Sequence, residues 1–202
     1  PLLEAEHIGA DGIIGLDSLQ GLRVMIDFRA DSISVDDAKA LGGNRGYEIV
    51  VRARKRLGRL IITEAQIDGV RTALVIDTGS QGSIGNLALQ RKLRAAKGVE
   101  VTSTDVTGSE IVGRLDVPRT LQIGRTSGRN LMLKGLAISY ADAPAFAALS
   151  LNDTPAMVLG VEDLRLFDRV AIDFAERTVL FDLPKDARTG FADVSARVSR
   201  RL

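Results

Sequence analysis

The feature that most constrains this chain is an apolar segment that runs directly into a carboxylate. Residues 73–80 read Ala-Leu-Val-Ile-Asp-Thr-Gly-Ser, so Asp77 ends an apolar strand. A carboxylate at the end of a buried strand is costly unless its surroundings are built to hold it. The small residues Thr78, Gly79 and Ser80 suit a tight turn that presents Asp77 to a cleft. An exposed Asp at an ordinary turn is the alternative interpretation.

The flanking segments place this strand in a larger pattern. Residues 61–67 are predicted to form a strand, Asp68 and Gly69 a hairpin turn, and residues 70–76 the returning strand. Further along, Met157, Val158, Leu159 and Gly160 form a second apolar strand that ends in Gly. Many short strands separated by Gly turns predict an all-β, barrel-like unit.

This order of elements, over residues 60–183, resembles the retropepsin-like aspartic proteases of the pepsin clan. In that family a hairpin delivers an Asp-Thr-Gly-Ser/Ala loop, and a later apolar-apolar-Gly strand passes beside it. The resemblance implies an all-β retropepsin-like barrel lobe with one or two short helices, part of a two-lobe pseudo-dimer. It implies an aspartic endopeptidase that acts on polypeptides and needs neither a metal nor another cofactor. A periplasmic or secreted bacterial protein is expected from the resemblance alone.

The resemblance also implies roles for the residues around Asp77, which is the expected catalytic residue. Thr78 would brace two loops across an interface, Gly79 would leave room for close backbone approach, and Ser80 would hydrogen-bond the carboxylate. Ordinary turn chemistry is the alternative role for Ser80. The strand at Val158, Leu159 and Gly160 would support the loop.

An aspartic protease needs two carboxylates that share one proton. Only Asp77 has the strand-Asp-Thr-Gly context. Asp17 and Asp163 are predicted to cap or solvate the next short helix, and Asp27 and Asp173 to be structural. The second Asp is therefore expected from an upstream lobe or from a second copy in a homodimer. A non-catalytic peptide-binding or assembly module on the same fold is the alternative function.

The chain contains an internal repeat. Residues 13–35 align with residues 158–181, so that Gly15 matches Gly160, and Ile-Asp-Phe at 26–28 matches Ile-Asp-Phe at 172–174. Each copy predicts an apolar-apolar-Gly strand, a short helix and a hairpin. The offset would place a partner Asp loop before Pro1. We therefore expect residues 1–35 to be the C-terminal remnant of a first lobe.

The remaining boundaries follow from composition. Residues 36–57 are predicted to be a linker and entry strand, 58–184 a complete lobe, and 185–202 a charged tail. A basic run precedes the first hairpin and comprises Arg52, Arg54, Lys55, Arg56 and Arg59. It is interpreted as a solvated strand edge, with a processing site or an anionic-surface contact as the alternatives.

Two elements are predicted after the Asp loop. Asn86 is expected to cap a helix over residues 87–96 that ends at Gly98. Residues 99–115 read as two strands around Thr107, Gly108 and Ser109. By position this hairpin corresponds to the family's flap, which folds over substrate; an ordinary surface hairpin is the alternative.

Composition excludes several other chemistries. The net charge is +1 and aromatic residues make up 4%, so neither a nucleic-acid footprint nor a base-stacking platform is expected. The absence of Cys removes thiol catalysis and disulfides, and His7, the only histidine, lies outside the predicted complete lobe. A Ser-His-Asp triad in that lobe and a multi-His zinc site are therefore excluded. No run of about 18 apolar residues predicts a membrane span.

Overall fold

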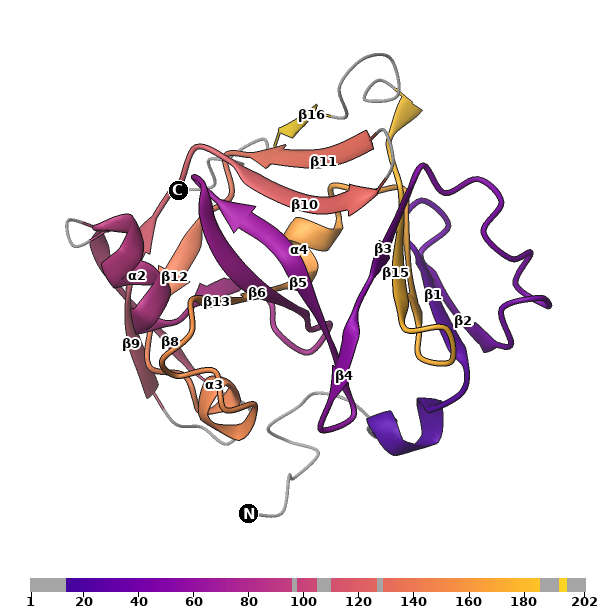
Figure 1. The fold of residues 1–202 in the computed structure, drawn as a ribbon, viewed down its shortest axis with the longest axis horizontal. Coiled ribbons are helices and arrows are strands. Elements are labelled where there is room, and N and C mark those ends of the chain that lie inside the picture. The colour runs from indigo at the N-terminus through magenta and orange to yellow at the C-terminus, as the bar shows by residue number, and fades with distance from the viewer. Residues whose placement is uncertain (1–13, 96–97, 105–109, 127–128, 186–192, 196–202) are drawn as a thin grey trace.

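The computed structural model describes residues 14–95, 98–104, 110–126, 129–185 and 193–195. They form a mainly β structure with a few short helices, arranged as two sheets (Figure 1). The smaller sheet has the order β2-β1-β14-β15-β3, with bounds β1 Arg23–Asp27, β2 Ser32–Asp36, β3 Ile49–Arg52, β14 Arg169–Asp173 and β15 Thr178–Asp182.

The larger sheet has the order β16-β11-β10-β5-β6-β13-β7-β12-β9-β8, and β4 pairs with β5. Its strands are β4 Arg54–Arg56, β5 Arg59–Ile67, β6 Val70–Ile76, β7 Ser83–Gly85, β8 Val99–Thr104, β9 Glu110–Asp116, β10 Leu121–Thr126, β11 Arg129–Lys134, β12 Ile138–Tyr140, β13 Ala156–Leu159 and β16 Asp193–Ser195. The described end strands, β16 and β8, do not pair with each other, so the expected barrel closure is not found in this part of the chain. The mainly β composition agrees with the prediction.

The predicted hairpin before the Asp loop is present as β5 and β6. Its turn residues, Asp68 and Gly69, both have positive φ, as a type I′ turn requires. The Asp68 carboxylate accepts hydrogen bonds from the backbone N–H groups of Arg119 and Thr120. Because β6 returns directly from this turn, the hairpin fixes where Asp77 emerges.

The helices are short: η1 Leu16–Leu19, α2 Leu87–Leu93, α3 Pro144–Ala148 and α4 Val161–Leu164. Asn86 caps α2 as predicted, because its side chain accepts from the N–H of Leu89 at 2.8 Å. The helix was predicted to extend over residues 87–96, but it ends earlier, at Leu93. Arg94 adopts a left-handed conformation and its N–H returns to the carbonyls of Gln90 and Arg91, which stops the helix before Gly98.

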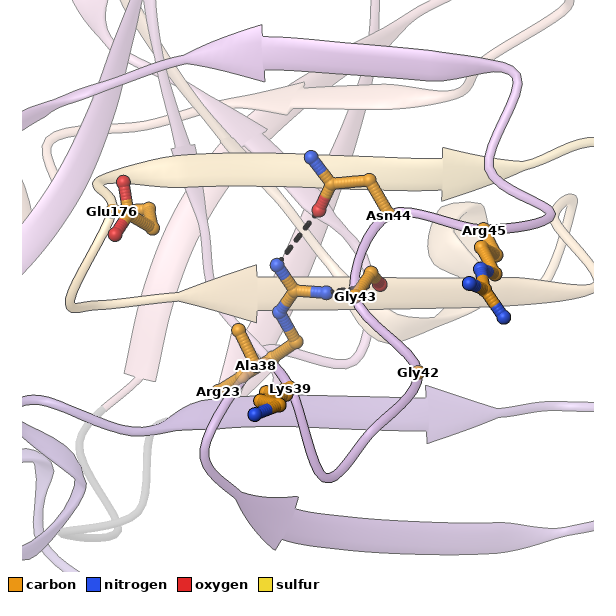
Figure 2. Close-up of a pocket in the computed structure, with 8 residues that line it drawn as sticks. All are labelled: Arg23, Ala38, Lys39, Gly42, Gly43, Asn44, Arg45 and Glu176. Atoms are coloured by element: carbon orange, nitrogen blue, oxygen red, sulfur yellow. Dashed lines mark hydrogen bonds between the residues drawn. The ribbon is translucent and has the colours of Figure 1, made fainter.

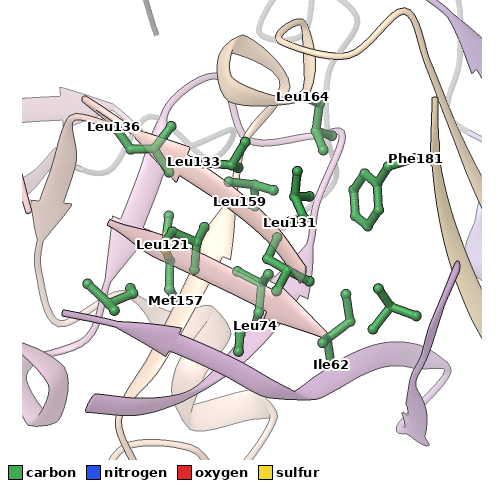
Figure 3. Packing of buried hydrophobic residues seen from close by; sticks show 14 of the residues in the cluster. Ile62, Leu74, Leu121, Leu131, Leu133, Leu136, Met157, Leu159, Leu164 and Phe181 are labelled. Atoms are coloured by element: carbon green, nitrogen blue, oxygen red, sulfur yellow. The ribbon is translucent and has the colours of Figure 1, made fainter. Parts of the chain in front are cut away.

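The main core lies between the two sheets and is made of aliphatic and aromatic side chains. Figure 3 shows Leu74, Leu121 and Leu159 gathered with Phe181 in this cluster. The rings of Phe167 and Phe181 are 4.8 Å apart. A second cluster around Phe146 lies under α3 and includes Val75 and Val158. Val75 and Val158 face each other across β6 and β13, so this cluster lies beside the strand that carries Asp77.

The two segments that the sequence aligns as a repeat pair with each other. Strand β1 runs antiparallel to β14, so both segments contribute neighbouring strands to the smaller sheet. The following segment is held in place (Figure 2): the buried Arg23 donates to the carbonyl of Gly43 and to Asn44 Oδ1. The predicted linker is therefore anchored across this sheet at residues 43 and 44. Within the predicted charged tail, β16 pairs in parallel with β11.

Candidate active site

Asp77 lies directly beyond the end of β6, where two parallel strands finish together. Strand β6 pairs in parallel with β13, Ile76 opposite Leu159, and the N–H of Asp77 donates to the carbonyl of Leu159 at 3.2 Å. Parallel strands present their carboxyl ends at the same edge of a sheet. The loop after Asp77 and the turn after Leu159 are therefore brought together, as the sequence predicted for Val158, Leu159 and Gly160.

The loop after Asp77 is braced by the start of α4. The N–H of Val161 donates to the carbonyl of Ser80 at 2.8 Å, and that of Glu162 to the carbonyl of Gln81 at 3.0 Å. A Cβ at Gly160 would collide with the carbonyl oxygen of Gly82, so only glycine fits there without displacing the loop. These contacts hold the Asp loop against β13.

Both carboxylate oxygens of Asp77 are engaged. Oδ1 accepts from the N–H of Gly79 at 3.0 Å, and Oδ2 accepts from Arg59 Nη1 at 2.8 Å. The side chains of Arg59 and Asp77 are 37% and 25% exposed, so the ion pair lies at the surface of the site. Gly79 is close-fitting, because a Cβ there would lie 3.3 Å from Oδ1.

The hydroxyl of Ser80 does not hold the carboxylate, which corrects the role implied by the resemblance. It donates instead to the carbonyl of Gly82 at 2.8 Å, which is the turn chemistry that was the alternative. Thr78 is exposed in this chain. Its expected role of bracing a second loop stays a prediction.

A cleft of about 670 Å³ opens beside Asp77. Its walls come from the Asp loop, from β7, β8, β9, β12 and β13, and from the start of α3; the lining residues are Asp77, Gly79, Ser80, Gln81, Gly82, Ser83, Ile84, Ser103, Thr104, Ile111, Ser139, Ala143, Pro144, Ala145 and Val158. Among these described lining residues Asp77 is the only acid. The other lining residues are uncharged: aliphatic and hydroxyl side chains, the Gln81 carboxamide and two glycines. Such a surface is suited to an uncharged or apolar segment.

The predicted flap is described up to its tip. Strands β8 and β9 pair antiparallel, with Thr104 opposite Glu110, and Ser103, Thr104 and Ile111 line the cleft. The expected tip residues, Thr107, Gly108 and Ser109, lie outside the described residues. The strand ends next to the turn of this hairpin therefore line the cleft, and the hairpin's covering role stays a prediction.

A buried polar pair lies behind the Asp loop. Ser83 Oγ donates to Asp163 Oδ2 and accepts from the N–H of Gly160 at 3.1 Å. Burial raises the pKa of the Asp163 carboxyl, and the bond from Ser83 partly opposes that rise. Asp163 was expected to cap a helix, but Gly160 occupies that cap position and Asp163 binds Ser83 instead.

Sequence reasoning missed Arg59 and the Ser83–Asp163 pair. Arg59 is 18 residues before Asp77 and was grouped with a basic run interpreted as a solvated edge. The position of Arg59 in the sequence could have predicted this contact. Arg59 is the first residue of β5, and the last residue of β5 leads through the turn into β6. In an antiparallel hairpin the start of the first strand lies beside the end of the second, so the first residue of β5 lies near the residue that follows β6.

Other types of site are not seen in the part of the chain described here. No group of three or more His, Cys, Asp or Glu among the described residues is arranged to hold a metal ion. Within the same residues, no helix has the length and apolar character needed to cross a bilayer.

Comparison with known proteins finds likenesses among solved structures and none among protein families or curated sequences. No protein-family model matches this sequence, and no curated protein matches it either. The structure is similar to that of a retropepsin-like aspartic protease from Rickettsia conorii, with a TM-score of 0.46 and 18% sequence identity. The match covers 67% of this chain and 89% of the other.

Proposed function

We propose that this chain is part of an aspartic endopeptidase that hydrolyses peptide bonds in extended polypeptides. The observation that carries the proposal is the placement of Asp77, which sits on a braced loop at the wall of an open cleft. An acid held at such a cleft is a candidate for acid-base chemistry.

The proposed reaction uses Asp77 and a second carboxylate that share one proton. Two carboxyl groups a few ångströms apart lose their protons in separate steps, so one is a base while the other is an acid. The ionised member takes a proton from water, which attacks the scissile carbonyl, and the protonated member donates to the carbonyl oxygen. No other acid lines the cleft among the described residues, so the second carboxylate comes from a second lobe.

The substrate would lie along the cleft as an extended strand. The lining of the cleft would offer the hydroxyl groups of Ser103, Thr104 and Ser139, from β8 and β12, and the aliphatic side chains of Ile84 and Val158, from β7 and β13. An extended peptide gains main-chain hydrogen bonds from polar rims and specificity from alternate side-chain pockets. Thr107, Gly108 and Ser109 would close over it.

The test is Asp77→Asn in the longest natural polypeptide that contains this chain, assayed on a proteome-derived peptide library from pH 3 to pH 7. Asn is nearly isosteric, so folding should be retained while cleavage is lost. Asp142→Asn, at an exposed position outside the cleft, is the matched control and should cleave normally. Undiminished cleavage by Asp77→Asn would refute the assignment. The 202-residue chain alone, shown to be monomeric by light scattering, is expected to be inactive.

The hydrogen bonds of the Asp77 carboxylate favour a second candidate function, a non-catalytic peptide-binding module. Both of its oxygens have protein partners, as a non-catalytic peptide-binding module would tolerate. Such a module would bind library peptides in the cleft without cutting them. Peptide binding that is equal in wild type and Asp77→Asn, with no cleavage by any longer form, would identify this alternative.

A further inference from the structure

The turn between β4 and β5 is built from an unusual residue. These strands are joined by Leu57 and Gly58, whose φ values are 47° and 80°. A two-residue turn with positive φ at both positions normally places Asn, Asp or Gly first, because a bulky side chain is strained there. The Asp68–Gly69 turn of the same chain, with φ values of 44° and 83°, follows that rule. The β4–β5 turn has a leucine in its place.

Burial does not compensate for this strain. The Leu57 side chain is 73% exposed. Among the described residues other than glycine that have positive φ, Leu57 is the only apolar one. Asn or Asp at this position would relieve the strain and remove apolar surface from water. The folding of the hairpin therefore does not account for Leu57, and its place points to a contact outside the chain.

Basic side chains lie directly behind this tip. Strand β4 consists of Arg54, Lys55 and Arg56, and all three are exposed. None of these three side chains has an ion-pair partner among the described residues. Arg59, which faces Arg56 across the ladder, is held by Asp77 instead. A charged strand edge would explain the cations alone, but it would not explain the leucine at their head.

The cations lie on both faces of the hairpin. Successive residues of a strand point to opposite faces, so Lys55 projects on the side opposite to Arg54 and Arg56. A partner that covered one face would meet only part of this charge. A surface approached tip first would meet all three cations together, with Leu57 ahead of them. Figure 1 shows the β4–β5 turn projecting at the lower end of the molecule, as such an approach requires.

The projecting turn is anchored by η1. Gln20 Nε2 donates to the carbonyl of Gly58 at 3.3 Å. Leu60, two residues beyond the turn, is 4% exposed, and Leu16 and Leu19 of η1 pack against the cluster that contains it. The tip is therefore presented in one orientation, which lowers the entropy cost of binding through it.

We infer that the β4–β5 turn docks this chain on an anionic phospholipid surface. An apolar tip followed by cations matches the order of polarity at a bilayer interface, where acyl chains lie beneath anionic head groups. Leu57 enters the acyl boundary, and the three side chains of β4 pair with lipid phosphates. One apolar side chain and three cations support a reversible, salt-sensitive association. Nucleic acid fits this hairpin less well, because residues 54–67 include no aromatic side chain to stack on a base.

Docking through this turn has a consequence for orientation. Arg59 follows Leu57 by two residues and contacts Asp77, so the Asp77 end of the hairpin would lie near the lipid. The inference itself stands on Leu57 and β4 and does not depend on the proposed peptidase chemistry.

The first test measures how this chain partitions between buffer and vesicles that are separated by sedimentation. Phosphatidylglycerol vesicles are the probe, and phosphatidylcholine vesicles are the neutral control. Partition onto phosphatidylglycerol is expected to be at least tenfold greater, and to fall at least tenfold when the salt concentration rises from about 50 mM to about 500 mM. Equal partition onto both lipids would overturn the inference.

Two triple variants separate this hairpin from bulk charge. Arg54→Gln/Lys55→Gln/Arg56→Gln should lower the partition onto phosphatidylglycerol at least tenfold. Arg91→Gln/Lys92→Gln/Arg94→Gln removes the same charge from exposed positions at the end of α2, and it should bind within about twofold of wild type. Equal losses in the two variants would overturn the inference, because binding would then depend on net charge alone.

A tryptophan reporter measures the depth of the tip directly. The chain contains no Trp, so Leu57→Trp supplies a single emission signal. On phosphatidylglycerol vesicles this emission should shift to shorter wavelength and be quenched by brominated lipid. Val99→Trp, on β8 at a position that is 72% exposed, is the matched control and should do neither. Unshifted emission from Leu57→Trp, or an equal shift from both variants, would overturn the inference.

Soluble polyanions test the choice of partner. Polyglutamate and a duplex oligonucleotide are titrated into the same Leu57→Trp chain. Saturation by either one at a lower concentration of charge than phosphatidylglycerol requires would overturn the choice of lipid, in favour of an acidic polypeptide or a nucleic acid. Because no readout here is cleavage, a failure of the docking is separate from a failure of the proposed function.

Discussion

Arg59 donates a hydrogen bond to Oδ2 of Asp77 at 2.8 Å, from the strand that precedes the Asp-bearing strand. The N–H of Gly79 donates to the other carboxylate oxygen, Oδ1. In the proposed reaction, a water molecule or a partner carboxylate would hydrogen-bond to one of these oxygens. The Arg59 guanidinium donates to Oδ2, one of the two oxygens that this reaction would use. Arg59 therefore forms an ion pair with the carboxylate on which the proposed chemistry depends.

Removing this cation should activate the assembled enzyme. Arg59→Met is expected to raise kcat/KM about tenfold, roughly 1.4 kcal/mol of barrier, because Oδ2 becomes free. The free energy of unfolding should change by less than about 1 kcal/mol, since the pair is partly solvated. Arg56→Met, on the exposed β4, is the control and should leave kcat/KM unchanged. A loss of activity in Arg59→Met would instead make Arg59 part of the machinery.

Gly160 should be intolerant of a single added carbon. Its Cβ would overlap the carbonyl of Gly82, so Gly160→Ala should cost about 1–3 kcal/mol of unfolding free energy and displace the Asp77 loop. Gly15 occupies the same helix-cap position in the first repeat copy, with no atom within 4 Å of an added Cβ. Urea unfolding of Gly15→Ala should match wild type. Equal costs at both positions would contradict the steric argument.

Asp163 should make stability depend on pH. Burial raises its pKa above 3.8, so the folded chain holds the proton more tightly than the unfolded chain does. The contribution of this group is complete below pH about 4 and declines as pH rises through the folded pKa. Asn can still accept from Ser83 but cannot ionise. Asp163→Asn should therefore gain stability relative to wild type as pH rises from 4 to 7, measured by urea unfolding. A difference that is constant with pH would contradict this.

The buried ion pair between β1 and β14 should contribute more to the free energy of unfolding than the exposed ion pair nearby. Arg23 and Asp173 are 3% and 0% exposed and lie 2.8 Å apart, so Arg23→Met should cost about 3–5 kcal/mol by leaving a buried charge unpaired. Arg29 and Asp168 form a pair in which Arg29 is 60% exposed. Arg29→Met should cost at most about 1 kcal/mol. Thermal unfolding of the two variants in parallel tests the contrast.

The sequence predicted what depends on local pattern. The hairpin of β5 and β6, its Asp68–Gly69 turn and the Asn86 cap each follow from residues close together in the chain. The neighbourhood of β6 and β13 was predicted through the resemblance. The end of α2 was misplaced because Arg94, a residue with ordinary helix propensity, takes a left-handed conformation.

Long-range pairing was not predictable in the same way. The repeat showed that two hairpins are alike, but a shared pattern does not say which edges meet. The side-chain partners of Asp77 and Asp163 depend on which direction a flexible Arg59 or a small Ser83 takes in the folded chain. Whether the larger sheet closes into a barrel likewise depends on long-range pairing. Its described end strands, β8 and β16, do not pair with each other.

The pairing of β1 with β14 sets an order of events during synthesis. Arg23 and Asp173 are 150 residues apart, yet each is the other's neighbour in the folded sheet. At about 5–20 residues per second, a ribosome takes roughly 8–30 s to make the second after the first. During that interval β1 has emerged without its partner strand, and its apolar face is available to other chains. The β1–β2 hairpin is therefore secured only after β14 has been made, and the yield of folded protein should fall when translation between the two strands is slowed.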